Sequence, residues 1–352
     1  MSVSVIRNFV AFTIFSFLLF SCNSANEDTY NKRVKHFRHL VFSETPYDKF
    51  QGIYPLTGSE AEKINNYTLS YDEDGKLTSV AYMRGEDLLG YSGRGYAKVE
   101  ISYTDSTETH HYFNKDNRPQ EYMGVFVSIY KLDAEGNRIG LSFMDRNSNK
   151  IENRNKVAYF IWKILPDGMV QEKRYNLEDE ETVMNANCPF YELRFSYDKN
   201  GYCTRLANYM ADTLYNCTIE NCGDIGVSYF LFEYNEKGGL KKFSVFNVRG
   251  QMSNLYSGWS RFINTLDKNG YVTEVIYYDQ DNEPLGGRNN PITATVYDEH
   301  GAVIERKYMD KDRNLFVRSS VGAAVVKYSY DEEGHPVDTT YFDTSLAEIV
   351  KK

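Results

Sequence analysis

One short pattern recurs along almost the whole chain and constrains its fold more than any other feature. Asp, two variable residues and Gly occur at 72–75, 133–136, 198–201, 267–270, 298–301 and 331–334, with variants at 166–168 and 235–238. Successive glycines lie 31 to 37 residues apart, except for one interval of 61 residues that contains a degenerate unit with Thr107 in the glycine position. Self-similarity at such a period is typical of repeat proteins, and it predicts nine units of about 32 residues.

Each unit has the pattern of a β-hairpin. The Asp side chain accepts hydrogen bonds from backbone amides just after it, and Gly adopts a positive φ, so the motif predicts a tight turn. The flanking residues alternate, as in Leu193, Phe195 and Tyr197, which is the period of a strand with one buried face. We therefore expect an all-β protein, in which residues 67–345 form an elongated, curved antiparallel sheet or solenoid.

Other positions keep the same register. An aromatic or large aliphatic residue stands four residues before every Gly, as at Tyr71, Tyr197, Tyr297 and Tyr330, and another aromatic follows the Gly by seven or eight residues. We expect these residues to form core ladders that stack from one unit to the next. Such a sheet offers a broad surface for contacts and is expected to have no deep cleft.

The segments that flank the repeats have separate predicted roles. Residues 46–66 are expected to be an N-terminal cap, since an array of hairpins needs its open end covered. Ser59 and Glu62 have capping-box spacing, which predicts a short helix over residues 59–66. Residues 346–352 are expected to be a C-terminal tail.

The beginning of the chain has the features of an export signal. Arg7 precedes an apolar run over residues 9–20, which is well short of the roughly 20 residues that span a bilayer. Leu19, Phe20, Ser21 and Cys22 then resemble the bacterial lipobox. This resemblance implies a signal peptide over residues 1–21, lipid attachment at Cys22 and a tether over residues 22–45. It implies a location in the cell envelope, at the outer membrane, with the lipid as the only contact with the membrane.

The repeat itself resembles a known class. Tyr-Asp-x-x-Gly followed by a short β run is similar to the tyrosine–aspartate repeats of RHS-type bacterial surface proteins, and residues 322–334 are similar to longer envelope relatives of about 32 residues. The resemblance covers about residues 67–345 and implies repeated hairpins. It implies little about activity. Since eleven residues follow Tyr341, a toxin domain like that at the C-terminus of RHS proteins is not expected.

Composition excludes one class of partner. The formal net charge is −9, and Lys and Arg do not cluster within the repeats. Because phosphate backbones are bound by clustered cations, nucleic acid is not expected as a partner.

Four cysteines follow the lipidation site: Cys188, Cys203, Cys217 and Cys222. An even number in an exported chain makes disulfides plausible, and we expect at least one. Cys188 and Cys222 are 34 residues apart, close to one repeat, and could pair between adjacent units. A disulfide between Cys217 and Cys222 would instead close a loop within the extra residues of the longest unit. Both pairings are open.

No sequence motif indicates catalysis, a cofactor or a metal. The six histidines do not assemble into a known pattern, and no nucleophile has an identifiable base. Residues 145–149 and 310–314 have the alternating oxygen ligands of a calcium loop, but they lack its Gly and Glu. We expect solvated turns there, and we do not expect an enzyme.

Function is expected to come from residues that break the repeat. Aromatic residues outside the repeated positions are expected to be free to face solvent. The candidates for ligand stacking are Trp162 and Trp259, together with Tyr96, Tyr256 and Tyr271. The expected function is a binding or scaffolding surface for a protein or a glycan. The alternatives are a glycan- or peptide-processing enzyme, indicated by a deep pocket with two convergent carboxylates, and an RHS-like shell or delivery component, indicated by a closed hollow barrel.

Overall fold

The computed structural model describes residues 33–90, 93–185, 188–217, 226–285 and 291–350. Within these ranges the chain is almost entirely β, with one short helix, and its 23 strands belong to a single antiparallel sheet. The elements are β1 (Val34–Leu40), β2 (Gly52–Leu56), α2 (Gly58–Ala61), β3 (Asn66–Tyr71), β4 (Leu77–Arg84), β5 (Asp87–Leu88), β6 (Lys98–Tyr103), β7 (Thr107–Phe113), β8 (Val127–Leu132), β9 (Arg138–Met144), β10 (Tyr159–Ile164), β11 (Val170–Tyr175), β12 (Glu192–Tyr197), β13 (Cys203–Met210), β14 (Thr213–Leu214), β15 (Tyr229–Tyr234), β16 (Leu240–Phe246), β17 (Arg261–Leu266), β18 (Val272–Tyr278), β19 (Ile292–Tyr297), β20 (Val303–Met309), β21 (Val325–Tyr330), β22 (Pro336–Phe342) and β23 (Glu348–Ile349).

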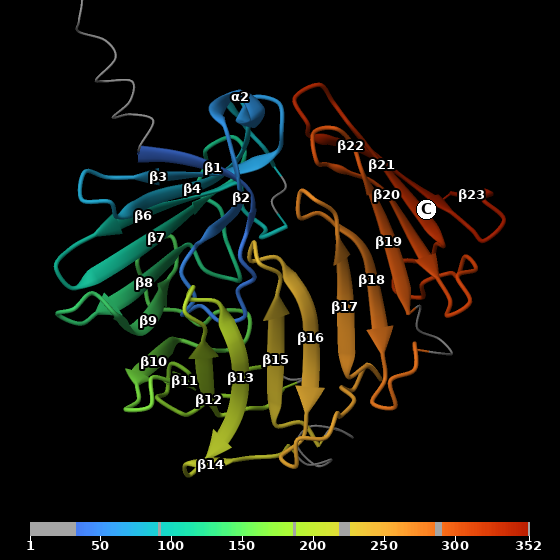
Figure 1. Ribbon diagram of the computed structural model, residues 1–352. Coiled ribbons are helices and arrows are strands. Elements are labelled where there is room, and N and C mark those ends of the chain that lie inside the picture. Colours follow the sequence, from blue (N-terminus) through green and yellow to red (C-terminus); the bar gives the residue numbers. More distant parts are fainter. Residues whose placement is uncertain (1–32, 91–92, 186–187, 218–225, 286–290, 351–352) are drawn as a thin grey trace, which may run out of the picture.

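Nine hairpins follow one another through the sheet, as the repeat predicts. They are β3–β4, β6–β7, β8–β9, β10–β11, β12–β13, β15–β16, β17–β18, β19–β20 and β21–β22. Each hairpin pairs with the next, so the strands run round the molecule in chain order (Figure 1). Among the described strands no pairing joins β2 at one edge to β23 at the other, and the sheet is therefore open.

The hairpin turns have the predicted geometry. In the first turn, Oδ1 of Asp72 accepts hydrogen bonds from the backbone N–H groups of Asp74 and Lys76, at 3.0 and 2.8 Å. Gly75 closes this turn with a φ of +79°, a conformation that glycine adopts at little cost. The sequence motif therefore specifies both the position of the turn, through Asp, and its left-handed backbone conformation, through Gly.

The tyrosine four residues before the glycine has a role that the sequence did not reveal. We expected a core ladder, but the ring also carries a hydroxyl that donates to a backbone carbonyl of the preceding unit. The bonds run from Tyr103 to Leu77, from Tyr234 to Cys203, from Tyr297 to Val272 and from Tyr330 to Val303, at 2.8–3.1 Å. In each case the acceptor lies two residues after the glycine position of that preceding unit, so the same bond recurs along the array and joins neighbouring units.

The second turn of each unit lies at the opposite end of the hairpin and uses the same chemistry. Oδ1 of Asp145 accepts from the N–H groups of Asn147 and Asn149 at 2.7 and 2.8 Å, and Ser148 has a φ of +65°. Asp310 holds its turn in the same way. The two calcium-like segments are therefore turns whose carboxylates bind backbone amides, which agrees with the solvated-turn interpretation.

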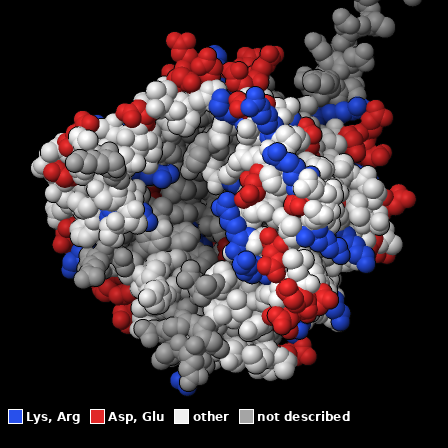
Figure 2. All heavy atoms as spheres, turned by 180° about the vertical axis from the view of Figure 1, so that it is seen from behind, with Lys and Arg blue, Asp and Glu red and all other residues white. Residues whose placement is uncertain are grey.

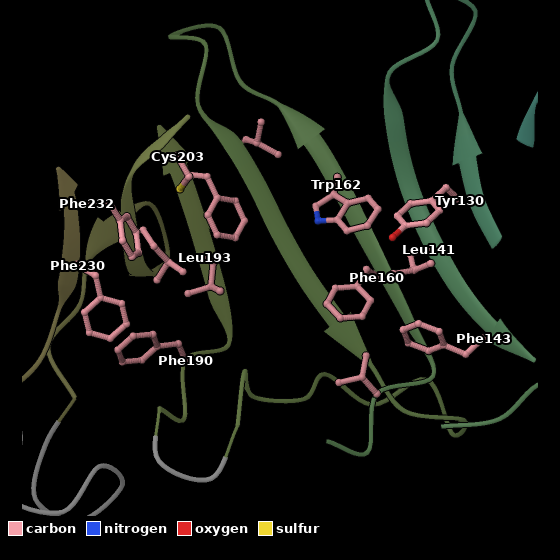
Figure 3. Close-up of a cluster of buried hydrophobic side chains, with 14 of the residues drawn as sticks. Tyr130, Leu141, Phe143, Phe160, Trp162, Phe190, Leu193, Cys203, Phe230 and Phe232 are labelled. Carbon is pink, nitrogen blue, oxygen red and sulfur yellow. The ribbon is translucent and has the colours of Figure 1, made fainter. Parts of the chain in front are cut away.

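The inner face of the curved sheet carries the core. Alternate residues of successive strands meet there in one apolar cluster, including Tyr130, Phe160, Leu193, Phe195 and Phe232. Figure 3 shows several of these side chains projecting from the same side of the sheet towards the concave interior. The period-two pattern of each strand thus becomes a continuous buried surface along the array.

The N-terminal region differs from the prediction at two places. Residues 34–40, assigned to a tether, form β1, which pairs with β2 and β3 and so extends the sheet. The predicted helix over residues 59–66 is shorter and begins earlier: Thr57 is its N-cap, and Thr57 and Glu60 form the capping box. The first residue of each capping box can be Ser or Thr, so the spacing alone could not choose between two overlapping patterns.

The two edges of the open sheet are held together through turns. The backbone N–H of Asn65 donates to the carbonyl of His300 at 2.8 Å, and Nη1 of Arg84 donates to the carbonyl of Glu332 at 3.1 Å. At the end of the chain, residues 348–349 of the predicted tail pair with β22 as β23. No helix in the described part of the chain is both long and apolar enough to span a membrane.

Candidate ligand-binding pocket

Residues 41–56, which we call the plug, cross the concave side of the sheet between β1 and the end of β2 (Figure 1). Arg138 on β9 fixes the plug, since its Nη1 donates to the carbonyl oxygens of Pro46, Tyr47 and Asp48 at 3.0–3.1 Å. The part of the plug before β2, which forms no strand, is therefore held by a side chain of the sheet. The predicted cap over residues 46–66 thus lies inside the curved sheet and not only over its open end.

Side chains along the plug reach several units of the array. Thr45 donates to Oε2 of Glu172 on β11 at 2.7 Å, and the ring of Phe50 stacks on His110 of β7 with centroids 5.8 Å apart. The hydroxyl of Tyr197 on β12 donates to Oδ1 of Asp48 at 2.8 Å. The hydroxyl of Tyr197 therefore bonds to the plug, whereas the hydroxyls of the equivalent tyrosines bond to the preceding unit.

The hairpin turns meet the plug at one end of the molecule. The side chain of Gln51 donates to the carbonyl of Asn200 at 3.2 Å, and Asn235 donates to the hydroxyl of Tyr54 at 2.8 Å. The ring of Tyr54 also lies where a Cβ on Gly270 would stand. The turns of successive units that contain these glycines therefore lie around the plug.

A charged cluster lies beneath the plug. Glu108 accepts from Nε2 of His110 at 2.7 Å and from the guanidinium of Arg138, and all three side chains are buried. Burial disfavours the ionised carboxyl, but the bond from His110 and the charge of Arg138 outweigh it and lower the pKa of Glu108 to about 2. This cluster supports Arg138, and therefore the plug, and its polar groups are already paired.

The plug and the inner face of β6–β13 enclose a cavity of about 300 Å³. We expected no deep cleft, and this expectation was wrong because a separate segment closes over the concave surface. Seven phenylalanine and tyrosine rings line the cavity: Phe50 from the plug, and Tyr96, Tyr112, Tyr122, Tyr130, Phe143 and Phe160. Asn153, Asn155 and Asn185 also line it, from the loops at the end opposite to the Gly turns. A cavity that combines aromatic and aliphatic side chains with converging polar groups is a usual form of a small-molecule site.

Glu44 is an unusual carboxyl in this cavity. Burial raises its pKa to about 8, with a smaller contribution from the neighbouring charge of Asp48. The titratable groups that face it are Asp48 in the plug and Cys188, Cys203 and Tyr234 on the sheet. The pKa values of the two thiols and of the tyrosine are also raised by burial, so these groups are neutral near pH 7.

Glu172 and Arg174 on β11 also line the cavity. Oε2 of Glu172 accepts from Thr45 and from Nε1 of Trp162 at 2.7 and 2.8 Å, and Oε1 lies 3.5 Å from Nε of Arg174. Sequence reasoning missed both residues. Their signal was the period of two, because Glu172 and Arg174 are in phase with the buried Val170 and therefore had to point inwards.

The predicted stacking residues have different positions. Trp162 is 3% exposed and lies in the core beside Phe160 and Tyr130, so the prediction that it faces solvent was wrong. Trp259 is partly buried against aromatic residues of β16–β18. The interior of a strongly curved sheet can hold large rings that lie outside the repeated positions. The periodicity of the sequence alone does not indicate that such rings are buried.

The other three aromatic residues outside the repeated positions also differ in their exposure to solvent. Tyr96 lines the cavity and is buried, and Tyr271 is buried beside the turn at Gly301. Tyr256 is 80% exposed, as expected for a residue that faces solvent.

The cysteines are partly described. Cys188 and Cys203 are free thiols, whereas Cys217 is disulfide-bonded. Pairing of Cys188 with Cys222 was therefore the wrong alternative. Cys222 itself, like the predicted lipidation site at Cys22, lies outside the described residues.

Comparisons with known proteins yield no family. No protein-family model matches the sequence, and no curated protein matches it either. A crystal structure of TcdB2–TccC3–TEV matches 79% of this chain and 14% of its own at 10% identity, with a TM-score of 0.30. A porin-like protein from Bacteroides uniformis matches 78% of this chain and 94% of its own at 9% identity, with a TM-score of 0.28.

A Photorhabdus luminescens Tc holotoxin pore matches 80% of this chain at 10% identity, with a TM-score of 0.23. This chain spans only 14% and 17% of the length of the two toxin chains. These TM-scores are too low to establish a common fold. The β-hairpin repeat is established by the strand register itself.

Proposed function

We propose that this protein is a lipid-anchored binding protein of the cell envelope and that its ligand is a saccharide bound in the cavity beneath the plug. The observation that carries the proposal is the cavity of about 300 Å³ between the plug and the sheet, with seven phenylalanine and tyrosine rings in its wall. This volume lies at the lower end of small-molecule sites. It suits one sugar ring, or the end of a longer glycan, better than the surface of a protein.

The side chains of the wall fit the chemistry of sugars. Aromatic rings offer flat apolar faces on which the C–H face of a pyranose can lie, and the side-chain amide of Asn155 offers a donor and an acceptor to hydroxyl groups. Asn155 is exposed at the entrance, so a longer glycan can extend from the cavity into solvent.

The carboxylates of the cavity favour binding over catalysis. Asp48 accepts from Tyr197 and from the backbone of Glu44 and Thr45. Glu172 accepts from Thr45 and from Trp162. Asp48 and Glu172 are therefore occupied by structural hydrogen bonds, which leaves Glu44 of the three carboxyl groups in the wall, whereas a glycoside hydrolase needs two that face the scissile bond.

A shell that carries another protein requires an interior large enough for a folded domain. Here the plug crosses the concave side, and the two pockets beside it measure about 300 and about 600 Å³, which is too small for a folded domain. A binding pocket is consistent with this filled interior, and we therefore favour it over a delivery shell.

The anchor belongs to the same proposal. The lipobox-like sequence at residues 19–22 would place the acyl chains just before the folded body, because β1 begins at Val34. Metabolic labelling with a fatty acid should mark the wild type, and Cys22→Ala should lose both the label and membrane association. A labelled Cys22→Ala protein would contradict the anchor without affecting the pocket.

The pocket is tested by a glycan array with residues 23–352 and two matched variants. Asn155→Trp narrows the entrance, and Asn147→Trp makes the same change at the equivalent exposed position of a turn that does not line the cavity. We expect glycan signals that Asn155→Trp abolishes and Asn147→Trp retains. Equal signals from the two variants would place binding elsewhere, and release of cleaved sugar would favour the enzyme alternative.

A further inference from the structure

Arg174 is a buried cation whose hydrogen-bonding capacity is incompletely used. Its side chain is 2% exposed, and within the described residues Nε and Nη1 have no hydrogen-bond partner. Nη2 makes a long bond of 3.4 Å to the carbonyl of Tyr191, and the 3.5 Å between Nε and Glu172 is an ion-pair distance without a hydrogen bond. Because an unpaired buried guanidinium costs free energy, this arrangement indicates that a further acceptor belongs beside it.

A second arginine on the next strand shows what full pairing looks like here. Arg194 also follows a glutamate by two residues, and its Nε donates to Glu192 at 2.8 Å. Its Nη2 donates to Asp212, and its guanidinium lies over the ring of Tyr209. Arg194 is on the outer face of the sheet, away from the cavity, since its neighbours Leu193 and Phe195 point inwards. Among the described arginines, Nε of Arg261 also lacks a partner, but Arg174 is the one with two unpaired nitrogens, and it lines the cavity.

The charges around the cavity favour an anion. Lys49, Arg94 and Arg174 are the basic residues of its lining apart from His110, and Asp48 and Glu172 are two of its three acidic residues. Glu44, the remaining carboxyl, keeps its proton near pH 7 because burial raises its pKa to about 8, and burial also lowers the pKa of His110, which stays neutral. With Glu44 neutral, the lining has three residues of the Lys and Arg type against two remaining acidic residues, in a protein whose net charge is −9. Figure 2 shows Lys and Arg side chains gathered along one wall of a hollow in the molecule.

We propose that the ligand is an acidic saccharide whose carboxylate binds Arg174. A carboxylate placed at Nη1 supplies the missing acceptor and balances the excess charge, and the planar guanidinium suits the planar carboxylate. The pyranose ring then lies among the aromatic residues of the wall. This inference rests on the proposed saccharide-binding function and names the chemical class within it.

The test is isothermal titration calorimetry of the mature protein with glucuronate and with glucuronamide, in which an uncharged amide replaces the carboxylate. We expect the wild type to bind glucuronate at least tenfold more tightly than glucuronamide. Arg174→Gln should reduce this ratio to about one, whereas Arg194→Gln should leave it unchanged. Melting temperatures of both variants establish that they fold.

The outcomes separate this inference from the proposed function. Equal binding of glucuronate and glucuronamide to the wild type would overturn the acidic class and leave saccharide binding standing, even if Arg174→Gln failed to fold. An unchanged ratio in a folded Arg174→Gln variant would overturn the role of Arg174. If neither sugar binds, acetate and succinate are titrated next: binding that depends on Arg174 would retain an anion site and refute the saccharide, and no binding would refute both.

Discussion

The contact between the plug and the hairpin turns makes a quantitative prediction about two glycines. Gly75 and Gly270 occupy the same position of the repeat, with φ values of +79° and +85°. A Cβ on Gly75 would meet nothing within 4 Å, whereas a Cβ on Gly270 would lie 2.6 Å from Cζ and 2.7 Å from Cδ2 of Tyr54. The two alanine variants therefore share the backbone cost and differ in the clash with the plug.

The magnitudes follow from these two terms. An L-residue in the left-handed region costs roughly 1–2 kcal/mol, so Gly75→Ala should lower the free energy of unfolding by about 1 kcal/mol. Overpacking typically costs about 1–3 kcal/mol more, so Gly270→Ala should lower it by about 2–4 kcal/mol. Urea denaturation followed by circular dichroism measures both values.

A double-mutant cycle with Tyr54→Ala identifies the cause. When the ring is absent, Gly270→Ala should cost no more than Gly75→Ala, which gives a coupling free energy of at least about 1 kcal/mol. Equal destabilisation by the two glycine substitutions, or a cycle without coupling, would refute the position of the plug among the turns.

Three further predictions concern buried groups. Glu44 keeps its proton in the folded protein up to about pH 8, whereas the unfolded chain loses it near pH 4.5, so the free energy of unfolding falls as the pH rises through this window. Glu44→Gln should therefore raise the melting temperature at pH 8 but not at pH 4. The same difference in melting temperature between variant and wild type at both pH values would contradict this. Trp162→Phe leaves a buried carboxylate with one donor fewer and should cost roughly 1–3 kcal/mol of stability by urea denaturation; an unchanged midpoint would argue against that bond. Alkylation in denaturant without reductant should label Cys188 and Cys203 but not Cys217, as peptide mass spectrometry would show, and labelled Cys217 would exclude its disulfide.

The repeat and its turns could be predicted from the sequence because their causes are local. The Asp side chain binds amides two and four residues after it, and the Gly conformation depends on its own φ, so a spacing of three residues identifies the whole turn. The hydroxyl of the tyrosine before each turn was missed because its acceptor lies in the preceding unit, 25–31 residues away in the chain. An aromatic ring at that position indicates burial, and burial alone does not indicate a hydrogen bond.

The candidate site could not be predicted because it depends on how far the sheet curves. Thr45 and Glu172 are separated by 127 residues in the chain, and only the fold brings them within hydrogen-bonding distance. We expected a curved sheet, but not one curved strongly enough to enclose residues 41–56 and to bury Trp162. Strong curvature instead buries Trp162 and turns the first segment of the folded body into the cover of a cavity.

A crystal structure of the mature protein with glucuronate tests the central claim most directly, because it locates the ligand. We predict that the sugar lies between the plug and β6–β13, with a carboxylate oxygen within hydrogen-bonding distance of Nη1 of Arg174 and with the cavity aromatics around its ring. A sugar bound on the outer face of the sheet, or in the cavity with its carboxylate directed away from Arg174, would contradict the account.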